Sequence, residues 1–271
     1  MTSESNSVVI RDAVDSDIDS IVGLFTEDGS NPYGWCADKW RHYYRNYPEG
    51  KPIALVAELN GMVVGHYGML PIKIGQLPAM LGMHAYVFSE YRGLTIISAL
   101  MKEVDKRCRA QGVAMICGFA NSKFSLIKKT FFKWKTLFWL GFKSGLTADD
   151  VRCEPAPFFF NYSPKWFAWR FGEVRDTYIS RYTDARGNIK KQLLKVNRGM
   201  ESPTPAELFD SEGWSPALVF LKEQRDQFCQ PFSLKIYDTS LLDAGVLRPE
   251  NWFIEMGDSD TFQYLPWSKM P

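Results

Sequence analysis

The chain has 271 residues, a length that fits one large domain or two small ones. Charged residues make up 23% and hydrophobic residues 45%, which excludes a disordered or low-complexity protein. The 32 Lys and Arg residues against 31 Asp and Glu residues leave a formal charge of +1, so the total charge encodes no attraction to a nucleic acid polymer or an anionic membrane. Aromatic residues reach 15%, and such rings fill cores, stack on flat ligands or form interfaces.

The cysteines and the first residues bear on the compartment. The five cysteines are odd in number and form no CxxC pair, which favours a reducing cytoplasm over a disulfide framework or a zinc site. Residues 1–5 have neither the basic nor the apolar part of a secretory signal. The apolar stretch near 131–142 is interrupted by Lys133 and Lys135. We expect a cytoplasmic protein with no membrane span and no metal.

The N-terminal elements begin with a β-branched run at residues 8–10, which predicts a strand. An amphipathic helix follows from Asp15 to Phe25, with acidic residues in its first turn. Residues 31–47 form a second, aromatic-rich helical region. The stretch 53–88 then predicts a meander of three antiparallel strands, with turns at Asn60–Gly61 and Gly75–Gln76.

The next elements alternate between helix and strand. Residues 98–111 have helical periodicity and end at Gly112. A short apolar strand at 113–117, a basic aromatic helix at 122–134 and an extended segment to Phe142 follow. This order predicts a mixed α/β (α+β) fold, with helices packed on a mixed sheet.

The C-terminal part reads as a second, smaller α/β unit. Residues 145–165 contain three prolines and are expected to form a connection. Strands are predicted at 176–183, 192–196 and 252–255, and a helix near 215–228. We therefore expect two domains, 1–150 and 151–271.

The segment from Tyr86 to Leu100 carries the strongest functional signal. A strand runs into a turn containing Gly93, and the turn opens a helix. Main-chain N–H groups at a helix N-terminus bind anions, and a glycine lets a phosphate approach closely. Only one glycine is present, so an ordinary strand-to-helix turn is the other interpretation.

This segment, the order of elements, and the opening Ile10–Ala13 with Asp17 together resemble the GNAT superfamily of coenzyme A-dependent N-acyltransferases over residues 7–145. The resemblance implies a GNAT fold with a splayed central sheet. The family's pyrophosphate loop reads Gln/Arg-x-x-Gly-x-Gly/Ala, and here Glu90, Gly93 and Thr95 hold those positions. The implied acyl-CoA contacts are Arg92, Gly93, Leu94, Thr95 and Ile96 in the loop, and Tyr86, Val87 and Phe88 along the pantetheine.

The resemblance also implies that the next strand parts from its neighbour and ends near an Asn, here Asn121. Asn121 and Lys123 complete the implied cofactor contacts. The helix 122–134 has no Tyr, so we assign no general acid to it. A basic cluster faces either the 3′-phosphate of coenzyme A or solvent: Lys123, Lys128, Lys129, Lys133 and Lys135.

A narrower likeness is to bacterial GNAT enzymes that acylate nucleotide-linked amino sugars for surface polysaccharide such as O-antigen lipopolysaccharide. It is carried by Gly118–Asn121, Trp166–Phe171 and Asn251–Asp260. Some of these proteins have two GNAT-like halves, which implies a second GNAT-like domain that contributes to the acceptor site. The implied reaction is direct transfer of an acyl group from acyl-CoA to the amine of a dTDP- or UDP-linked deoxyamino sugar.

An amine attacks a thioester as its free base, so a group with a pKa near neutral suits the reaction. Of the three histidines, His84 lies on the strand before the loop and is predicted as general base. His66, Trp35 and Tyr33 are predicted to contact the acceptor. The alternatives are a base acting through water, no protein base, or strand histidines bonded to backbone.

Two other functions stay open. One is a GNAT enzyme that acts on another small amine or a peptide, and the other is a non-catalytic module that binds acyl-CoA. The sequence leaves the oligomeric state open, and a homodimer is one possibility.

Overall fold

The computed structural model describes residues 7–29, 31, 34–143, 156–172, 177–183, 189–196, 217–221, 230–254 and 258. Its contacts divide the chain into two units. The first comprises Met1–Ile72 and Pro78–Gly118, and the second comprises Lys73–Leu77 and Phe119–Pro271. The division after Gly118 thus comes earlier in the chain than the predicted boundary at residue 150.

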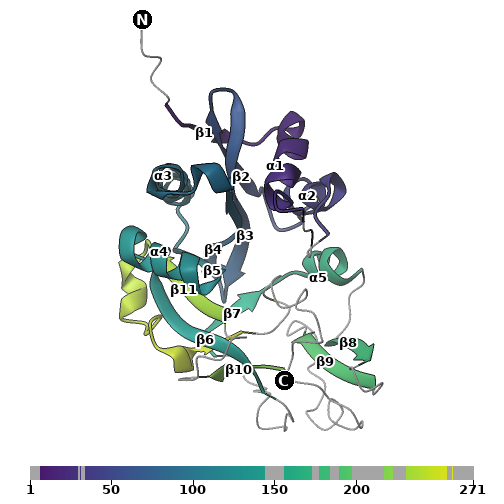
Figure 1. Ribbon diagram of the computed structural model, residues 1–271. Coiled ribbons are helices and arrows are strands. Elements are labelled where there is room, and N and C mark those ends of the chain that lie inside the picture. The colour runs from purple at the N-terminus through teal and green to yellow at the C-terminus, as the bar shows by residue number, and fades with distance from the viewer. Residues whose placement is uncertain are drawn as a thin grey trace, which may run out of the picture. The chain divides into compact units, whose positions relative to one another are not determined.

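The first unit is built on a mixed sheet with the strand order β1-β2-β3-β4-β5 (Figure 1). β1 with β2, and β2 with β3, are antiparallel, whereas β4 and β5 are parallel. This mixed α/β architecture confirms the predicted fold class. The strands are β1 (Val9–Asp12), β2 (Ile53–Leu59), β3 (Met62–Ile74), β4 (Leu77–Val87) and β5 (Met115–Phe119).

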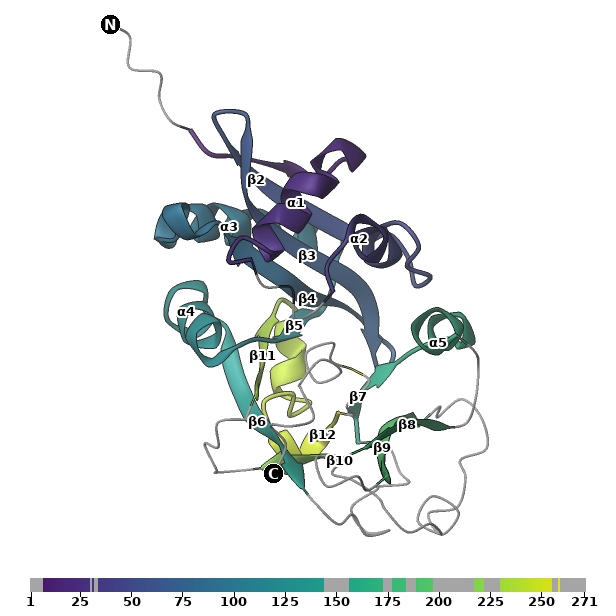
Figure 2. The same cartoon turned by 45° about the vertical axis from the view of Figure 1, so that its right-hand side comes forward.

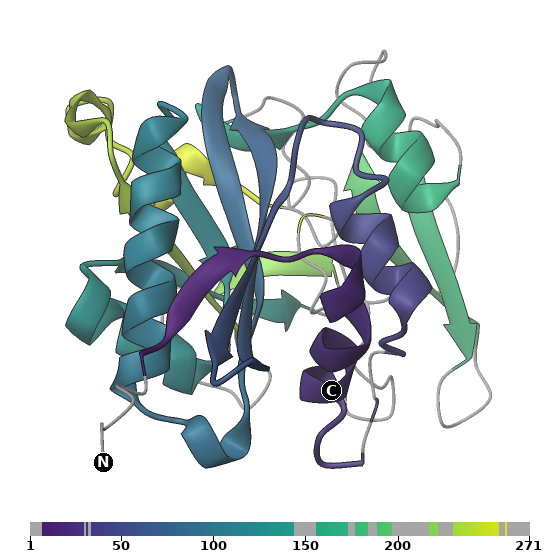
Figure 3. The ribbon, with the colours of Figure 1, turned by 90° about the horizontal axis from the view of Figure 1, so that it is seen from above.

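Helices cover both faces of this sheet. Figure 3 shows α3 on one side of β2–β4, and α1 and α2 on the other. The helices are α1 (Ile18–Phe25), α2 (Ala37–Tyr44) and α3 (Leu94–Ala110), and the 3-10 turns are η1 (Asp15–Asp17) and η2 (Ser89–Tyr91).

α3 begins at Leu94, one turn before the start predicted at Ser98. Its buried side chains follow the expected three-and-four spacing from Ile96 to Cys108. Leu94 and Thr95 are exposed, so the first turn lacks the apolar signal that marks the rest of the helix.

One ion-pair cluster joins the N-terminal segment to the sheet. The Arg11 guanidinium donates to both carboxylate oxygens of Asp17, at 2.7 and 2.9 Å, and to Glu58 at 2.8 Å. The buried Asp17 also accepts from the Val14 N–H. Arg11 lowers the pKa of Asp17, so this contact favours the charged carboxylate.

The second unit has a three-stranded antiparallel arrangement in which β6 (Lys135–Lys143) lies between β11 (Gln230–Ile236) and β10 (Ala217–Leu221). β7 (Phe158–Asn161) pairs with Lys73 and Ile74 of the β3–β4 hairpin tip, and in parallel with β12 (Trp252–Phe253). Figure 2 shows these strands. The remaining elements are α4 (Ser122–Phe132), α5 (Pro164–Phe171), the hairpin β8 (Thr177–Thr183)–β9 (Ile189–Val196), η4 (Thr239–Leu242) and η5 (Pro249–Asn251).

Two predictions for this unit are wrong. The expected connection 145–165 contains β7 and the start of α5, and the helix expected near 215–228 is strand β10 over Ala217–Leu221. Strand β11 had no prediction. A run of five apolar residues is too short for its periodicity to distinguish a strand from a buried helix. Pairing with a neighbouring strand determines which of the two it becomes.

Aromatic side chains fill the second unit's core. Phe232 is fully buried and its ring centroid lies 5.2 Å from Phe119, 5.2 Å from Phe138 and 5.1 Å from Trp252. Much of the aromatic excess is therefore packing. In the part of the chain that the structure describes, no helix has the length and hydropathy that a membrane crossing requires.

We expect Gly68→Ala to destabilise the first unit by about 1–3 kcal/mol, since overpacking forces neighbours to shift. A Cβ on Gly68 would overlap the Tyr44 hydroxyl, and the Tyr44 ring is buried. Urea unfolding measures the change in the free energy of unfolding. Gly23→Ala is the control: Gly23 is an exposed residue of α1 where a Cβ has open space, so this substitution should stabilise by about 0.5–1 kcal/mol. Equal effects of the two substitutions would contradict the packing argument.

Candidate functional site

The parallel pairing of β4 with β5 ends early. Partners are Ala79 with Met115, Met80 with Ile116 and Leu81 with Cys117, and the ladder goes no further although β4 continues to Val87. This matches the parting of the two strands that the resemblance implied. The last six residues of β4 thus present one edge that β5 does not cover.

The turn after β4 opens α3 without a cap. Gly93 is the N-cap residue with an extended φ of 175°, and among the residues that the structure describes no side chain accepts from the first helical N–H groups. The first turn has no acidic residue, and the space where a Gly93 side chain would begin is open to 4 Å. Unsatisfied N–H groups and the helix dipole favour an anion at this point. Gly93, Leu94, Thr95 and Ile96 are therefore brought together in one turn whose N–H groups and dipole suit an anion.

Arg92, predicted to bind the cofactor, already has protein partners. Its guanidinium donates to Val87 O at 3.1 Å, to Glu27 Oε1 at 2.8 Å and to Tyr86 Oη at 2.9 Å. The other Glu27 oxygen accepts from the Ser89 N–H at 3.0 Å. The Glu27 carboxylate is only 9% exposed, whereas Arg92 is 56% exposed. A phosphate that reaches Arg92 has to compete with this carboxylate.

Sequence reasoning missed Glu27, which lies beyond α1 and 65 residues before Arg92. No local pattern links the two positions. Burial raises the pKa of the Tyr86 phenol, and the neighbouring Glu27 adds to the shift, so Tyr86 stays neutral near pH 7. The three predicted pantetheine residues Tyr86, Val87 and Phe88 are half-buried.

His84 lies within β4 and has left-handed backbone geometry, at φ 52°. A non-glycine residue rarely adopts this region, so surrounding contacts must hold it. The half-buried His84 ring has Nδ1 2.7 Å from the Tyr44 hydroxyl. The ring also meets Trp35 edge-on at 4.5 Å and Tyr43 at 4.9 Å. An aromatic cage from the α2 segment thus surrounds the predicted base.

The His66 side chain holds the backbone of His84 through a hydrogen bond to its carbonyl group. Trp40 Nε1 can only donate, and it lies 3.4 Å from His66 Nε2, so Nε2 accepts and Nδ1 carries the hydrogen. Nδ1 then donates to the His84 carbonyl at 2.8 Å. His66 is fully buried, and desolvation lowers its pKa to about 4. An acceptor molecule can reach His66 only if these bonds break, and the predicted contact stays a prediction.

The other predicted acceptor residues differ in what the structure says of them. Trp35 is 7% exposed, and its ring stacks on Phe25 at a centroid distance of 4.4 Å. Its exposed part is small, so packing accounts for most of the ring. Tyr33 lies outside the described residues.

Asn121 and Lys123 belong to the second unit. The Asn121 side chain accepts from the Phe124 N–H at 2.8 Å and so caps α4, while Lys123 is exposed. Lys128 is 2% exposed, and its ammonium lies 3.9 Å from the centroid of the Trp134 ring. Lys128 thus does not lie on a solvated helix face. In the described ranges, no three His, Cys, Asp or Glu side chains gather as a metal would require.

Comparisons with known proteins agree on the fold. No protein-family model matches the chain, and no curated protein matches it in sequence. A conserved protein of unknown function from Enterococcus faecalis, described as a probable N-acyltransferase, is 11% identical with a TM-score of 0.58, covering 86% of this chain and 73% of that one. A GCN5-related N-acetyltransferase from Kribbella flavida is 11% identical with a TM-score of 0.58, covering 88% and 73%. The chain therefore has the fold of these proteins.

We expect the protein to lose stability on acidification because His66 becomes protonated. This loss should begin at a higher pH than the loss caused by protonation of Asp17. The folded-state pKa of about 4 lies below the ordinary 6.5, so the unfolded chain binds the proton more tightly. Stability is full above pH 6.5 and falls by about 3 kcal/mol as the pH drops to about 4. Asp17, with its lowered pKa, loses stabilisation only below its ordinary value of 3.8.

Urea unfolding at pH 7 and pH 4.5 measures this loss. His66→Asn keeps a donor for the His84 carbonyl and cannot titrate, so its stability should vary much less between the two values. The same pH dependence in the variant would show that another group is responsible.

Proposed function

We propose that this protein is a coenzyme A-dependent N-acyltransferase that passes an acyl group directly to an amine. The proposal depends on one observation above all: the uncapped N-terminus of α3 follows the strand end at which β4 and β5 part. The GNAT-like fold supports it. The residues present suit a negatively charged cofactor, because the α3 turn carries free N–H groups and no carboxylate.

The cofactor's pyrophosphate would be held by the main-chain N–H groups of Gly93, Leu94, Thr95 and Ile96. The β4 edge that β5 does not cover, at Tyr86 and Val87, and the adjoining Phe88 would pair with the amide groups of the pantetheine. Asn121 and Lys123 are further contacts on the family likeness alone. When bound, acyl-CoA supplies an acyl group activated as a thioester.

His84 would take the proton of the attacking amine. If Nδ1 donates its hydrogen to the Tyr44 oxygen, Nε2 carries the lone pair and is basic. If Tyr44 donates to Nδ1, Nε2 carries the hydrogen and can stabilise a developing oxyanion instead. In both cases the Tyr44 hydroxyl bonds to Nδ1 and holds the ring in place, so Tyr44 acts as a positioning residue for His84.

The acceptor we propose is the amino group of a dTDP- or UDP-linked deoxyamino sugar. The support is the likeness of Gly118–Asn121, Trp166–Phe171 and Asn251–Asp260 to enzymes of that kind. On the same likeness, residues 151–271 would be a second GNAT-like half that contributes to the acceptor site. Another small amine or a peptide is the alternative acceptor.

The test is an assay of purified protein with acetyl-CoA and longer acyl-CoAs against a panel of dTDP- and UDP-linked amino sugars. Acyl transfer is followed by mass spectrometry, which needs no thiol reagent and so avoids the exposed Cys36. Transfer to a nucleotide sugar supports the whole proposal. Transfer to other amines only would reject the acceptor, and CoA binding without any transfer would favour a non-catalytic module.

We expect Gly93→Asp to weaken CoA binding at least tenfold, about 1.4 kcal/mol, without loss of stability. The new carboxylate would cap the α3 N–H groups and repel the pyrophosphate, and its capping would add a few tenths of a kcal/mol to stability. Isothermal titration with CoA measures the affinity. Gly93→Ala is the control, because a Cβ has open space there and the φ of 175° suits any residue. Unchanged CoA affinity in Gly93→Asp would remove the anion-binding turn from the proposal.

We expect His84→Ala and His84→Gln to lower the rate more than tenfold, about 1.4 kcal/mol of activation free energy, and to flatten its profile over pH 6–9. CoA affinity should not change. Tyr44→Phe keeps the buried ring and should shift the pH profile, since it removes the hydrogen bond that the His84 Nδ1 makes. A loss under tenfold with the same profile in the His84 variants would reject His84 as the base.

A further inference from the structure

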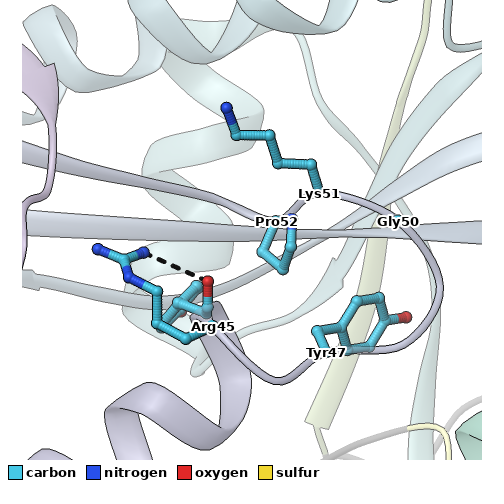
Figure 4. A pocket seen from close by; sticks show the side chains of 6 residues that line it. Arg45, Tyr47, Gly50, Lys51 and Pro52 are labelled. Carbon is cyan, nitrogen blue, oxygen red and sulfur yellow. Dashed lines mark hydrogen bonds between the residues drawn. The ribbon is translucent and has the colours of Figure 1, made fainter.

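A pocket of about 460 Å³ lies where α2 ends and the chain turns toward β2 (Figure 4). Its size falls within the range of small-molecule sites. It belongs wholly to the first unit, and none of the predicted cofactor or acceptor residues lines it. The lining residues are Tyr44, Arg45, Tyr47, Gly50, Lys51 and Pro52.

The two cations that line this pocket, Arg45 and Lys51, differ in whether they already have protein partners. Arg45 donates to Asp15 Oδ1 at 2.9 Å and to Ala13 O at 3.2 Å, and its guanidinium lies over the Trp40 ring at 4.7 Å. Asp15 offsets the charge of Arg45. Lys51 is exposed and makes no ion pair or hydrogen bond within the described part of the chain. The remaining charge of the pocket is therefore the positive charge of Lys51.

The backbone adds donors to this charge. Within the described ranges, the main-chain N–H groups of Gly50 and Lys51 donate to no protein acceptor. No acidic side chain is among the lining residues. A lysine ammonium and main-chain N–H groups are donors that anions select.

The aromatic walls offer little ring surface to a ligand. Tyr44 is 3% exposed and Tyr47 is 7% exposed, and the Tyr47 hydroxyl donates to Pro71 O at 2.8 Å. A nucleobase would need an open ring face for stacking. The pocket therefore suits an anionic group better than a flat one.

We infer that this pocket binds the anionic group, phosphate or carboxylate, of a small molecule, with Lys51 and the N–H groups of Gly50 and Lys51 as donors. Arg45 is held in place by its own contacts and forms one wall. The inference does not depend on acyl transfer, since its donors, Lys51 and the Gly50 and Lys51 N–H groups, have no part in the proposed acyl transfer.

The test is a titration of ¹⁵N-labelled protein, followed by amide chemical shifts at constant ionic strength. The probes are inorganic phosphate, dTDP and citrate. We expect saturable shifts of the Gly50 and Lys51 amides, and an affinity at least tenfold weaker in Lys51→Gln. Lys102→Gln is the matched control, because Lys102 is exposed on α3 and lies outside the pocket.

The three probes separate the sources of the anion. Binding of phosphate and dTDP without citrate supports a phosphate site, and binding of citrate alone supports a carboxylate site. No saturation by any probe up to about 10 mM, or equal affinity in Lys51→Gln, would overturn the inference. CoA added to the same samples reports on the Leu94–Ile96 amides, so a failure here is distinguishable from failure of the proposed function.

Discussion

The main-chain groups of β4 beyond Leu81 set the constraint on which the rest of the first unit depends. Buried N–H and C=O groups need hydrogen-bond partners, and β5 no longer supplies them there. Side chains take over part of this task. The His84 carbonyl accepts from His66, and the Val87 carbonyl accepts from Arg92. Each of these side chains is in turn held by another element, His66 by Trp40 on α2 and Arg92 by Glu27 after α1. The end of β4 thus has one edge without a strand partner, while side chains hold the carbonyl groups of His84 and Val87 in place.

Some of the many aromatic residues in this chain hold the two histidines in place. Trp40 and Tyr44 lie one turn apart on α2, and they contact the two histidines of neighbouring strands. Tyr44 can approach because Gly68 leaves its space on β3. These rings are core residues by burial, yet their polar atoms orient His66 and His84. Packing and site construction are performed here by the same side chains.

The sequence predicted the strands of the first unit and a helix after the turn at Gly93, because turn residues and apolar periodicity are local signals. It placed the start of that helix one turn late, at Ser98. It did not predict the left-handed geometry of His84, since such a residue leaves no pattern in a strand. Nor did it predict Glu27 as a partner of Arg92, which depends on how α1 packs. In the second unit, the strands β7 and β10 were not predicted, because pairing with neighbouring strands determines the structure of such short apolar runs.

The α3 turn has a consequence for which residues the proposed site requires. Main-chain N–H groups would hold an anion there through the backbone path and the absence of a cap, so the side chains of Glu90 and Thr95 would be free to vary. A TM-score of 0.58 beside 11% identity likewise shows a common fold with few residues in common. A site of this kind constrains the course of the main chain more than the identity of its side chains.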